Sequence, residues 1–406
     1  MSEPKRIVIV GGGLAGAGAA ASLRGRGYQG EVLVLGTDPH RPYELPPLSK
    51  GLLLGNVDEP DWVRGENFYA EHDIDLRAGL SATRIELGGR LVTDEDGERH
   101  RYDRLLLATG SRPRTLPVPG GDLPSLHTLR SLDDSLALRS AFERAGKVVI
   151  VGAGWIGTEA AAAARAHGAE VTVVEQDTLP LRAVLGDEIA TVFRDLHTGH
   201  GVQWRLGSAV AEFTRAGEAT EVRLADGGVL EADTVLVAVG ATPRVELAHA
   251  AGLELSGNGG IVVDAGLRTA APDVYAAGDI ASHFHPRYGT RVRVEHWANA
   301  KNQGEHVAGN LIGANEPYLR TPYFFTDQYD LGCEYRGLAD PATDELVVRG
   351  DPAAREFTAF WLREGTVTAA MNVNMWDDGD ALQALVEGRA QVDAETLRQG
   401  DLSGIG

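Results

Sequence analysis

Two glycine turns are the residues of this sequence whose types and spacing most directly predict chemistry. In the stretch GGGLAG, Gly11, Gly13 and Gly16 follow the apolar run RIVIV with the spacing G-x-G-x-x-G. This spacing allows a tight turn, a close approach of the backbone to a pyrophosphate, and close packing of a helix on a strand. The phosphate then meets the unsatisfied N–H groups of the helix N-terminus. The stretch GAGWIG repeats the pattern after KVVIV with Gly152, Gly154 and Gly157.

An acidic residue about 20 positions after each turn should accept hydrogen bonds from a ribose. Asp38 takes this place in the first unit, and Glu175 closes VTVVE in the second. A carboxylate at this position repels a 2′-phosphate, and the nearest cation after Glu175 is Arg182. We therefore expect two dinucleotides, one FAD and one nicotinamide, with NADH favoured over NADPH. A single site with a decayed copy is disfavoured, because both turns keep all their glycines.

Each turn lies in a segment that reads as strand, turn, Ala-rich helix and strand, over 6–38 and 147–177. This pattern predicts parallel βαβ units. Further strands are predicted within 102–114, 233–244 and 273–281. After about residue 320 the βαβ pattern ends. Residues 356–375 are predicted to form two strands joined by a turn at Glu364-Gly365, and residues 377–390 a helix. The predicted fold class is α/β, with two Rossmann-like domains and a C-terminal α+β domain.

Composition excludes several function classes. The net charge of −20 over 406 residues disfavours general nucleic-acid binding, although HFHPRYGTRVR (283–293) is a local basic stretch or a solvated loop. Apolar runs stay well short of the ~20 residues of a membrane span, and the N-terminus lacks a signal-peptide pattern. The single cysteine, Cys333, excludes an intramolecular disulfide, and the 12 histidines show no metal-ligand spacing. We expect no metal site and a cytoplasmic location.

Taken in order, several motifs resemble those of the FAD-dependent ferredoxin reductases of the putidaredoxin-reductase and dioxygenase-reductase type, whose fold is shared with apoptosis-inducing factor and glutathione reductase. The motifs are GGGLAG, RPYELPPLSK, ATGSRP, LRSLDD, GAGWIGTE, DVYAAGDIA, VEHWANAKNQG and PYFFTDQYD. The resemblance covers nearly the whole chain. It implies an FAD domain at 1–112 and 242–320, an NAD domain at 113–241, and a C-terminal interface domain at 321–406.

The resemblance also implies positions for both cofactors. Ala82 would lie beside the adenine, Arg130 at the pyrophosphate and Asp279 at the ribityl chain, while Trp297 would begin a helix facing the flavin pyrimidine. The implied FAD residues are Gly11, Gly13, Leu14, Ala15, Gly16, Asp38, Lys50, Ala82, Ala108, Thr109, Gly110, Arg130, Gly278, Asp279, Glu295, His296, Trp297 and Phe325. The implied NAD residues are Gly152, Gly154, Trp155, Ile156, Gly157, Glu159, Glu175, Arg182, Val239 and Gly240.

Lys50, at the end of RPYELPPLSK, matches the family lysine at the flavin N5/O4 edge, and Glu159 matches its glutamate partner. We expect these two residues to be catalytic, because a cation beside N5 favours the electron-rich reduced flavin. Pro46-Pro47 would hold the lysine rigidly. The alternative is an ordinary solvated lysine at a helix start. Three departures from the family pattern are Leu45, where Arg is usual, Phe325, where Trp is usual, and Arg182, which stands slightly out of the usual register.

The resemblance implies hydride transfer from NADH to FAD, and then single electrons to a [2Fe–2S] ferredoxin that serves a P450 or a ring-hydroxylating dioxygenase. No cysteine stands in 41–50, where thiol-dependent relatives carry one, so the electrons must leave the flavin directly. Ferredoxins are generally acidic, so docking should need positive charge, for which we nominate Arg287, Arg291 and Arg293. The alternatives are an NADH oxidase, a peroxide or disulfide reductase, and a redox-sensing protein of the apoptosis-inducing factor type.

Overall fold

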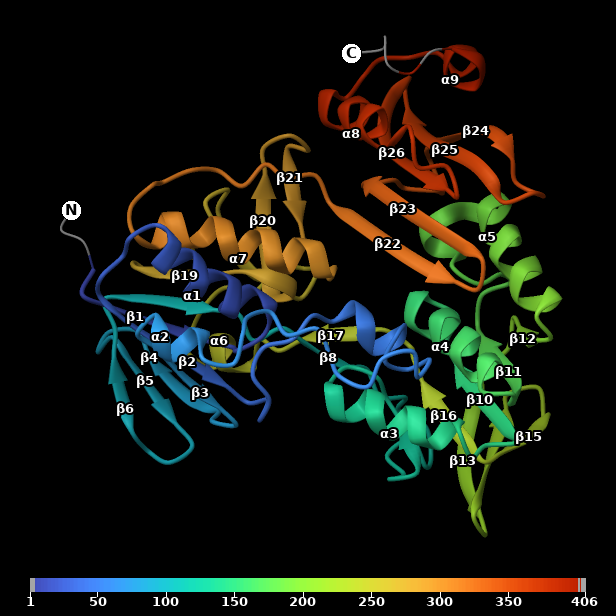
Figure 1. The fold of residues 1–406 in the computed structure, drawn as a ribbon, viewed down its shortest axis with the longest axis horizontal. Coiled ribbons are helices and arrows are strands. Elements are labelled where there is room, and N and C mark those ends of the chain that lie inside the picture. Colours follow the sequence, from blue (N-terminus) through green and yellow to red (C-terminus); the bar gives the residue numbers. More distant parts are fainter. Residues whose placement is uncertain (1–3, 401, 403–406) are drawn as a thin grey trace. The chain divides into compact units, whose positions relative to one another are not determined.

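The computed structural model describes residues 4–400 and 402, which divide into two compact units (Figure 1). Unit 1 takes the described parts of 1–45, 60–112 and 241–320. Unit 2 takes 46–59, 113–240 and the described parts of 321–406. The segment 46–59 therefore belongs to the same compact unit as the second glycine turn. Within the described residues, no helix is long and apolar enough to cross a bilayer.

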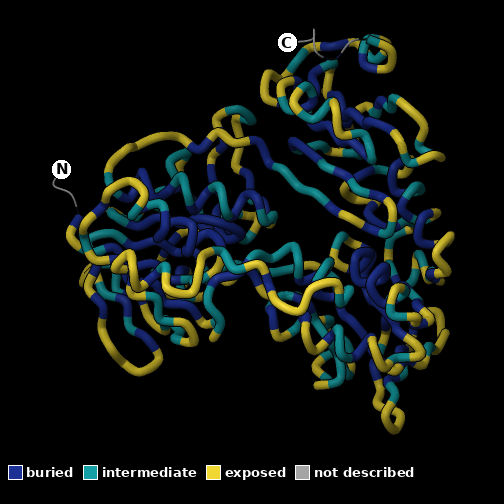
Figure 2. Tube along the Cα trace, viewed as in Figure 1, coloured by how far each residue is buried: buried dark blue, intermediate teal, exposed yellow. Residues whose placement is uncertain are grey.

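Unit 1 is built around a five-stranded parallel sheet in the order β19-β7-β1-β2-β3. The strands β1, β2, β7 and β19 are mostly apolar and buried, as in most parallel sheets, whereas the edge strand β3 also carries Asp75 and Arg77. Their bounds are β1 (Arg6–Val10), β2 (Glu31–Gly36), β3 (Ile74–Ala78), β7 (Arg104–Leu107) and β19 (Val274–Ala276). The buried strands of this sheet are dark blue in Figure 2.

Smaller sheets and short helices complete unit 1. An antiparallel sheet has the order β4-β5-β6, another sheet the order β18-β20-β21, and β17 pairs with β8. The strands are β4 (Ala82–Glu86), β5 (Leu91–Asp94), β6 (Arg99–Arg101), β8 (Ser111–Pro113), β17 (Ala241–Pro243), β18 (Ile261–Val263), β20 (Ala281–His285) and β21 (Thr290–Val292). The helices are α1 (Leu14–Gly25), α2 (Phe68–Glu71), α6 (Glu246–Ala250), α7 (Trp297–Leu311) and the 3₁₀ turn η2 (Gly278–Ile280).

Unit 2 repeats the parallel arrangement in the order β12-β11-β10-β16-β9 and adds two antiparallel sheets, β13-β14-β15 and β22-β23-β26-β25-β24. The first two sheets comprise β9 (Leu126–His127), β10 (Lys147–Val151), β11 (Glu170–Glu175), β12 (Gln203–Leu206), β13 (Val210–Ala216), β14 (Ala219–Leu224), β15 (Val229–Ala232) and β16 (Thr234–Val237). The helices are η1 (Pro46–Ser49), α3 (Leu132–Phe142), α4 (Trp155–Ala166), α5 (Arg182–Gly199), α8 (Gly379–Gly388) and α9 (Ala394–Gln399).

The C-terminal sheet carries a hydrophobic cluster on each face. Side chains of α5 contribute to one cluster, and those of α8 and α9 contribute to the other. Its strands are β22 (Tyr323–Gln328), β23 (Leu331–Gly337), β24 (Glu345–Asp351), β25 (Glu356–Arg363) and β26 (Thr366–Val373). The predicted turn at Glu364-Gly365 is confirmed: both residues have positive φ, as a tight hairpin requires. The predicted α/β class and both βαβ units are confirmed as well.

Segment 283–293 forms a hairpin of β20 and β21, so its description as a solvated loop is wrong. His283 and His285 point into the unit and are buried. Burial lowers the pKa of His283 to about 3, and burial also lowers the pKa of His296, next to α7, to about 4. Both rings are therefore neutral in the folded protein at neutral pH, whereas the unfolded chain takes up a proton near pH 6.5.

Helix α1 packs closely on α7 because its face consists of small residues. A Cβ built on Gly304 of α7 would lie 2.3 Å from the carbonyl oxygen of Ala15. A Cβ on Gly18 of α1 would lie 3.6 Å from the carbonyl oxygen of Lys301, which is an ordinary contact. Substitution of these two glycines by alanine should therefore affect the packing of the same helix pair differently, since a methyl group fits at Gly18 but not at Gly304.

We predict that Gly304→Ala lowers the free energy of unfolding by about 2–3 kcal/mol, because the backbone of α1 must move to admit the methyl group. Gly18→Ala should be neutral or slightly stabilising, since Ala is the better helix former. Urea unfolding followed by circular dichroism measures both changes. Equal effects of the two substitutions would contradict the packing described for this helix pair.

We also predict that the stability of the protein falls as pH falls from about 6.5 towards 5. A histidine whose folded pKa is depressed stabilises the fold fully above its unfolded pKa and loses that contribution as pH approaches its folded pKa. Each such histidine contributes a slope of about 1.4 kcal/mol per pH unit in this window. Urea midpoints measured against pH should show a smaller slope for His283→Asn than for His249→Asn at an exposed position. A flat profile between pH 7 and 5 would contradict the assignment.

Candidate dinucleotide and charge-transfer sites

The first glycine turn joins β1 to α1 at the carboxyl end of the unit 1 sheet. Gly11 has φ +119°, and a Cβ there would lie 2.1 Å from the carbonyl oxygen of Ala108. A Cβ on Gly16 would lie 1.9 Å from the carbonyl oxygen of Gly11, so only glycine fits either position. By contrast, a Cβ on Gly13 would meet no atom within 4 Å. The open side of the turn is thus at the N-cap of α1, where the N–H groups can bind a phosphate.

The second turn, between β10 and α4, has the same geometry. Gly152 has φ +103°, and its Cβ would lie 2.4 Å from the carbonyl oxygen of Ala238. A Cβ on Gly157 would lie 2.0 Å from the carbonyl oxygen of Gly152, whereas a Cβ on Gly154 would meet no atom within 4 Å. The residues present therefore fit a dinucleotide in each unit. In both glycine turns, space is open at the second glycine, where a pyrophosphate would approach, and closed at the first and third.

Most of the implied FAD residues of unit 1 lie at one edge of the sheet, because the carboxyl ends of parallel strands meet there. Asp38 follows β2, and its two carboxylate oxygens accept hydrogen bonds from the His40 N–H (2.9 Å) and the Tyr43 hydroxyl (2.6 Å). Residues 108–110 follow β7, and Gly278 and Asp279 follow β19. The N–H of Gly278 is held by Gln303 Oε1 of α7 at 2.8 Å. Asp279 is buried.

The predicted helix start at Trp297 is confirmed: α7 begins there, with His296 as its N-cap. The indole N–H of Trp297 donates to the carboxylate of Glu44, and Lys301 Nζ lies 3.5 Å from the same carboxylate. Glu44 was not predicted, although it stands next to Leu45 within RPYELPPLSK. Leu45 itself is half-buried and packs on the core of unit 1.

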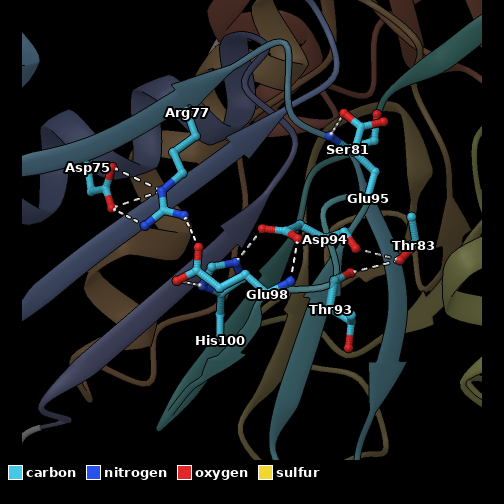
Figure 3. Close-up of polar contacts among 9 residues, drawn as sticks. All are labelled: Asp75, Arg77, Ser81, Thr83, Thr93, Asp94, Glu95, Glu98 and His100. Carbon is cyan, nitrogen blue, oxygen red and sulfur yellow. Dashed lines mark hydrogen bonds and ion pairs between the residues drawn. The ribbon is translucent and has the colours of Figure 1, made fainter.

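The hairpin that carries Ala82 is fixed by polar contacts shown in Figure 3. The Ser81 N–H donates to Glu95 Oε1 at 3.0 Å, and the buried ring of His100 contacts Asp94 Oδ2 at 2.8 Å. Asp94, Glu98 and His100 are close enough to hold a metal ion. However, Glu98 already forms an ion pair with Arg77 at 2.7 Å, which supplies the positive charge at this place. We read the group as a structural network of the hairpin.

Two of the three nominated docking arginines, Arg291 and Arg293, donate hydrogen bonds to backbone carbonyls. Arg291 Nη1 donates to the carbonyl oxygens of Val263 (2.5 Å) and Ser282 (3.1 Å). Arg293 donates to the carbonyl of Asn258 and forms an ion pair with Glu295 at 2.5 Å. Their role in docking, with that of the half-buried Arg287, stays a prediction.

In unit 2, Glu175 ends β11 and holds the second glycine turn. Its Oε2 accepts the Ala153 N–H at 2.7 Å, and its Oε1 accepts the Asp177 N–H at 2.9 Å. Arg182, at the start of α5, forms ion pairs with Asp177 at 3.1 Å and with Asp187 at 2.5 Å. Two carboxylates thus neutralise Arg182, the next cation after Glu175 in the sequence, which makes it a poor partner for a 2′-phosphate.

The other implied residues of unit 2 divide between packing and open positions. Trp155 packs on Phe324 (ring centroids 4.5 Å apart) and on Phe193 (5.7 Å). Ile156 is exposed beside the open Gly154, and Val239 and Gly240 follow β16. Arg130 precedes the capping box of α3, where its N–H donates to Asp134 Oδ2 at 2.9 Å.

Lys50 and Glu159 lie together in unit 2. Lys50 Nζ is 2.8 Å from Glu159 Oε1, and the two side chains are 16% and 2% exposed. The alternative of a freely solvated lysine is therefore wrong. The 3₁₀ turn η1 of the proline run places Ser49 and Lys50 against α4, which carries Glu159. The ring of Phe325 lies below the ammonium group, with its centroid 5.1 Å from Nζ.

Two further donors reach the same carboxylate, and sequence reasoning missed both. Ser49 Oγ donates to Glu159 Oε2, and Thr326 Oγ1 donates to Glu159 Oε1 at 2.6 Å. The sequence PYFFTDQYD contained a signal for Thr326. Thr326 and Gln328 stand two positions apart in a strand, so both side chains point to the same face. That this face meets α4 follows only from the tertiary structure.

Comparison with known proteins agrees with this geometry. Residues 5–304 match the family model for pyridine nucleotide-disulphide oxidoreductases, and residues 323–403 match the reductase C-terminal model. The ferredoxin–NAD(+) reductase component of the anthranilate 1,2-dioxygenase system from Burkholderia cepacia is 38% identical over 96% of each chain. Two solved structures are also similar. The ferredoxin reductase for the CYP199A2 system from Rhodopseudomonas palustris has a TM-score of 0.94 at 36% identity, covering 98% of this chain and 99% of the other. The reductase in the covalent putidaredoxin reductase–putidaredoxin complex has a TM-score of 0.92 at 33% identity, covering 99% and 97%.

We predict that Glu175→Ala lowers the preference for NAD⁺ over NADP⁺ about tenfold, because the repulsion of a 2′-phosphate is lost. Loss of the Ala153 contact weakens both nucleotides alike, so the ratio of the two dissociation constants isolates the ribose effect. Isothermal titration of the oxidised protein measures that ratio. Glu175→Gln, which keeps an acceptor but removes the charge, is the matched control and should recover the Ala153 contact without the selectivity. An unchanged ratio in both variants would place the selectivity elsewhere.

The two glycine cradles, the buried lysine–glutamate pair and the extent of the matches lead to one assignment: the chain belongs to the pyridine nucleotide-disulphide oxidoreductase family and, within it, to the FAD- and NAD(H)-dependent ferredoxin reductases of the putidaredoxin reductase type.

Proposed function

We propose that this protein is the NADH-dependent ferredoxin reductase of an oxygenase system. FAD, when bound, would accept the two electrons of one hydride from NADH and release them one at a time. A [2Fe–2S] ferredoxin would carry them to a P450 or a ring-hydroxylating dioxygenase. The residues named for each cofactor are our proposal for the two binding sites. The free buried thiol is consistent with a reducing, cytoplasmic location.

The Lys50–Glu159 pair is the observation that carries this proposal. Lys50 brings a positive charge that favours electron-rich reduced FAD, and Glu159 prevents that charge from being buried without a partner. The resemblance implies that thiol-dependent relatives carry a cysteine near 41–50, the segment that ends at Lys50. Phe325 offers an aromatic face beside the ammonium group but lacks the N–H of an indole.

The chain has no accessible thiol that could relay electrons instead. Cys333, its single cysteine, is 1% exposed in β23. Burial raises the pKa of its thiol, which keeps it protonated and unreactive. We therefore expect the electrons to pass directly from FAD to a protein carrier.

Anaerobic stopped-flow reduction tests the assignment. The FAD-loaded protein should be reduced faster by NADH than by NADPH, and should then reduce one member of a panel of [2Fe–2S] ferredoxins. Replacing Cys333 with Ala should leave both steps unchanged. Rapid oxygen consumption without ferredoxin would indicate an oxidase instead. Slow reduction that ends in a long-lived flavin–nicotinamide complex would indicate a redox sensor.

A further inference from the structure

Glu159 is the end of a longer chain of hydrogen bonds that runs through unit 2. Behind Thr326, the amide of Gln328 lies between two threonines on one side and His197 of α5 on the other. Gln328 Nε2 is 3.0 Å from Thr158 Oγ1 and 3.1 Å from Thr326 Oγ1. Gln328 Oε1 is 2.7 Å from His197 Nε2. Gln328 and His197 are both almost fully buried.

The hydroxyl protons of the two threonines fix the orientation of this amide. Thr326 donates its proton to Glu159, because a carboxylate only accepts. Thr158 donates its proton to helix carbonyls of α4, those of Gly154 (3.1 Å) and Trp155 (3.0 Å). Both threonine oxygens therefore offer only lone pairs to Gln328. The group of Gln328 that faces them must be its NH₂, and its carbonyl oxygen must face His197.

The same reasoning fixes the tautomer of His197. A carbonyl oxygen requires a donor, so Nε2 of His197 carries the proton and Nδ1 is an acceptor. The Tyr329 hydroxyl lies 3.5 Å from Nδ1 and can donate to it. Trp204, at a ring-centroid distance of 5.8 Å, and His200, which stacks on Tyr329 at 3.6 Å, are the other groups around the ring. Burial lowers the pKa of His197 to about 4, so the ring is neutral at neutral pH.

Every donor in this chain thus points towards Glu159, from Tyr329 through His197, Gln328 and Thr326 to the carboxylate. Hydrogen bonds that run in one direction strengthen one another in a buried environment. If His197 could not donate, Gln328 could turn its carbonyl oxygen towards Thr326. The hydroxyl of Thr326 would then donate to Gln328, and Glu159 would lose one of its donors.

We propose that His197 is a positioning residue of the charge-transfer site: through Gln328 it directs the Thr326 hydroxyl onto Glu159 and thereby sets how much negative charge the carboxylate presents to Lys50. The effect on FAD rests on the function proposed above. A carboxylate that loses a donor holds Lys50 more strongly and presents more negative charge. Both changes disfavour the anionic reduced cofactor and lower its midpoint potential.

The tautomer is tested first, in full-length protein labelled with ¹⁵N-histidine, both without FAD and loaded with it. The expected result is a neutral ring protonated at Nε2 throughout pH 6–8, and it does not depend on activity. A His197 protonated at Nδ1, or one that carries both protons at pH 6, would overturn the proposal. Resonance assignment uses His197→Gln.

Two substitutions test the effect on the cofactor. His197→Phe keeps a ring but removes the donor, whereas His197→Gln can still place an N–H towards Gln328. We expect His197→Phe to shift the reduction equilibrium of bound FAD about tenfold towards the oxidised form, which is about 30 mV for a two-electron couple. His197→Gln should stay close to the unsubstituted protein in an anaerobic redox titration.

Equal potentials in all three proteins, or equal shifts in both variants, would overturn the proposal. Tyr329→Phe removes only the outermost donor and should give a smaller shift of the midpoint potential with the same sign. It is the test variant if His197→Phe does not fold. A shift of opposite sign in either variant would also contradict it. A protein that shows the Nε2 tautomer and the potential shift but reduces no ferredoxin would refute the proposed function and leave this inference standing.

Discussion

A carboxylate taken out of water must be surrounded by donors, and the arrangement of unit 2 around Glu159 follows from that requirement. Its side chain is 2% exposed, and the ammonium group of Lys50 together with two hydroxyl groups occupies its oxygen atoms. Leaving one such charge without a partner costs several kcal/mol. Three segments far apart in the sequence, η1, α4 and β22, meet at this residue, so the ion pair also fixes their packing.

The chain uses one supersecondary unit twice but covers it differently. In both units the first glycine lies against the residue that follows the neighbouring parallel strand, Ala108 after β7 in unit 1 and Ala238 after β16 in unit 2. The third glycine lies against the carbonyl of the first. In unit 1 the small residues of α1 pack on α7. In unit 2 the corresponding helix, α4, packs on β22 of the C-terminal sheet. Helix α4 therefore brings Glu159 into contact with the C-terminal sheet. Helix α1 has no carboxylate at the corresponding position and forms no such site.

Much of this could be predicted from the sequence because the signals are local. Glycine spacing fixes the turns, apolar runs fix the buried strands, and Glu364-Gly365 fixes a hairpin. The hydrogen-bond chain from His197 to Glu159 could not be predicted, because its members come from α5, α4 and β22 and only tertiary packing joins them. The contact between Glu44 and Trp297 could not be predicted for the same reason. The hairpin at 283–293 was not predicted because its charged residues resemble those of a solvated loop, whereas the side chains of Arg291 and Arg293 donate to backbone carbonyls.

In the proposed function, local order in this network matters because charge transfer depends on where a few charges lie. Lys50 is the cation, Glu159 is its counter-charge, and the buried polar groups behind them set the orientation of both. The flexible lysine side chain is limited by the 3₁₀ turn below it and the ring of Phe325 beside it. A site organised in this way needs no nucleophile and no acid–base pair of its own.

A crystal structure of the FAD-loaded protein offers the most direct measurement, through the distance between Lys50 Nζ and the N5/O4 edge of the flavin. We predict a hydrogen-bonding distance, with the Glu159 contact retained. A flavin whose N5 edge is lined by other residues, with Lys50 remote from it, would contradict the central claim that this ion pair is the site of charge transfer.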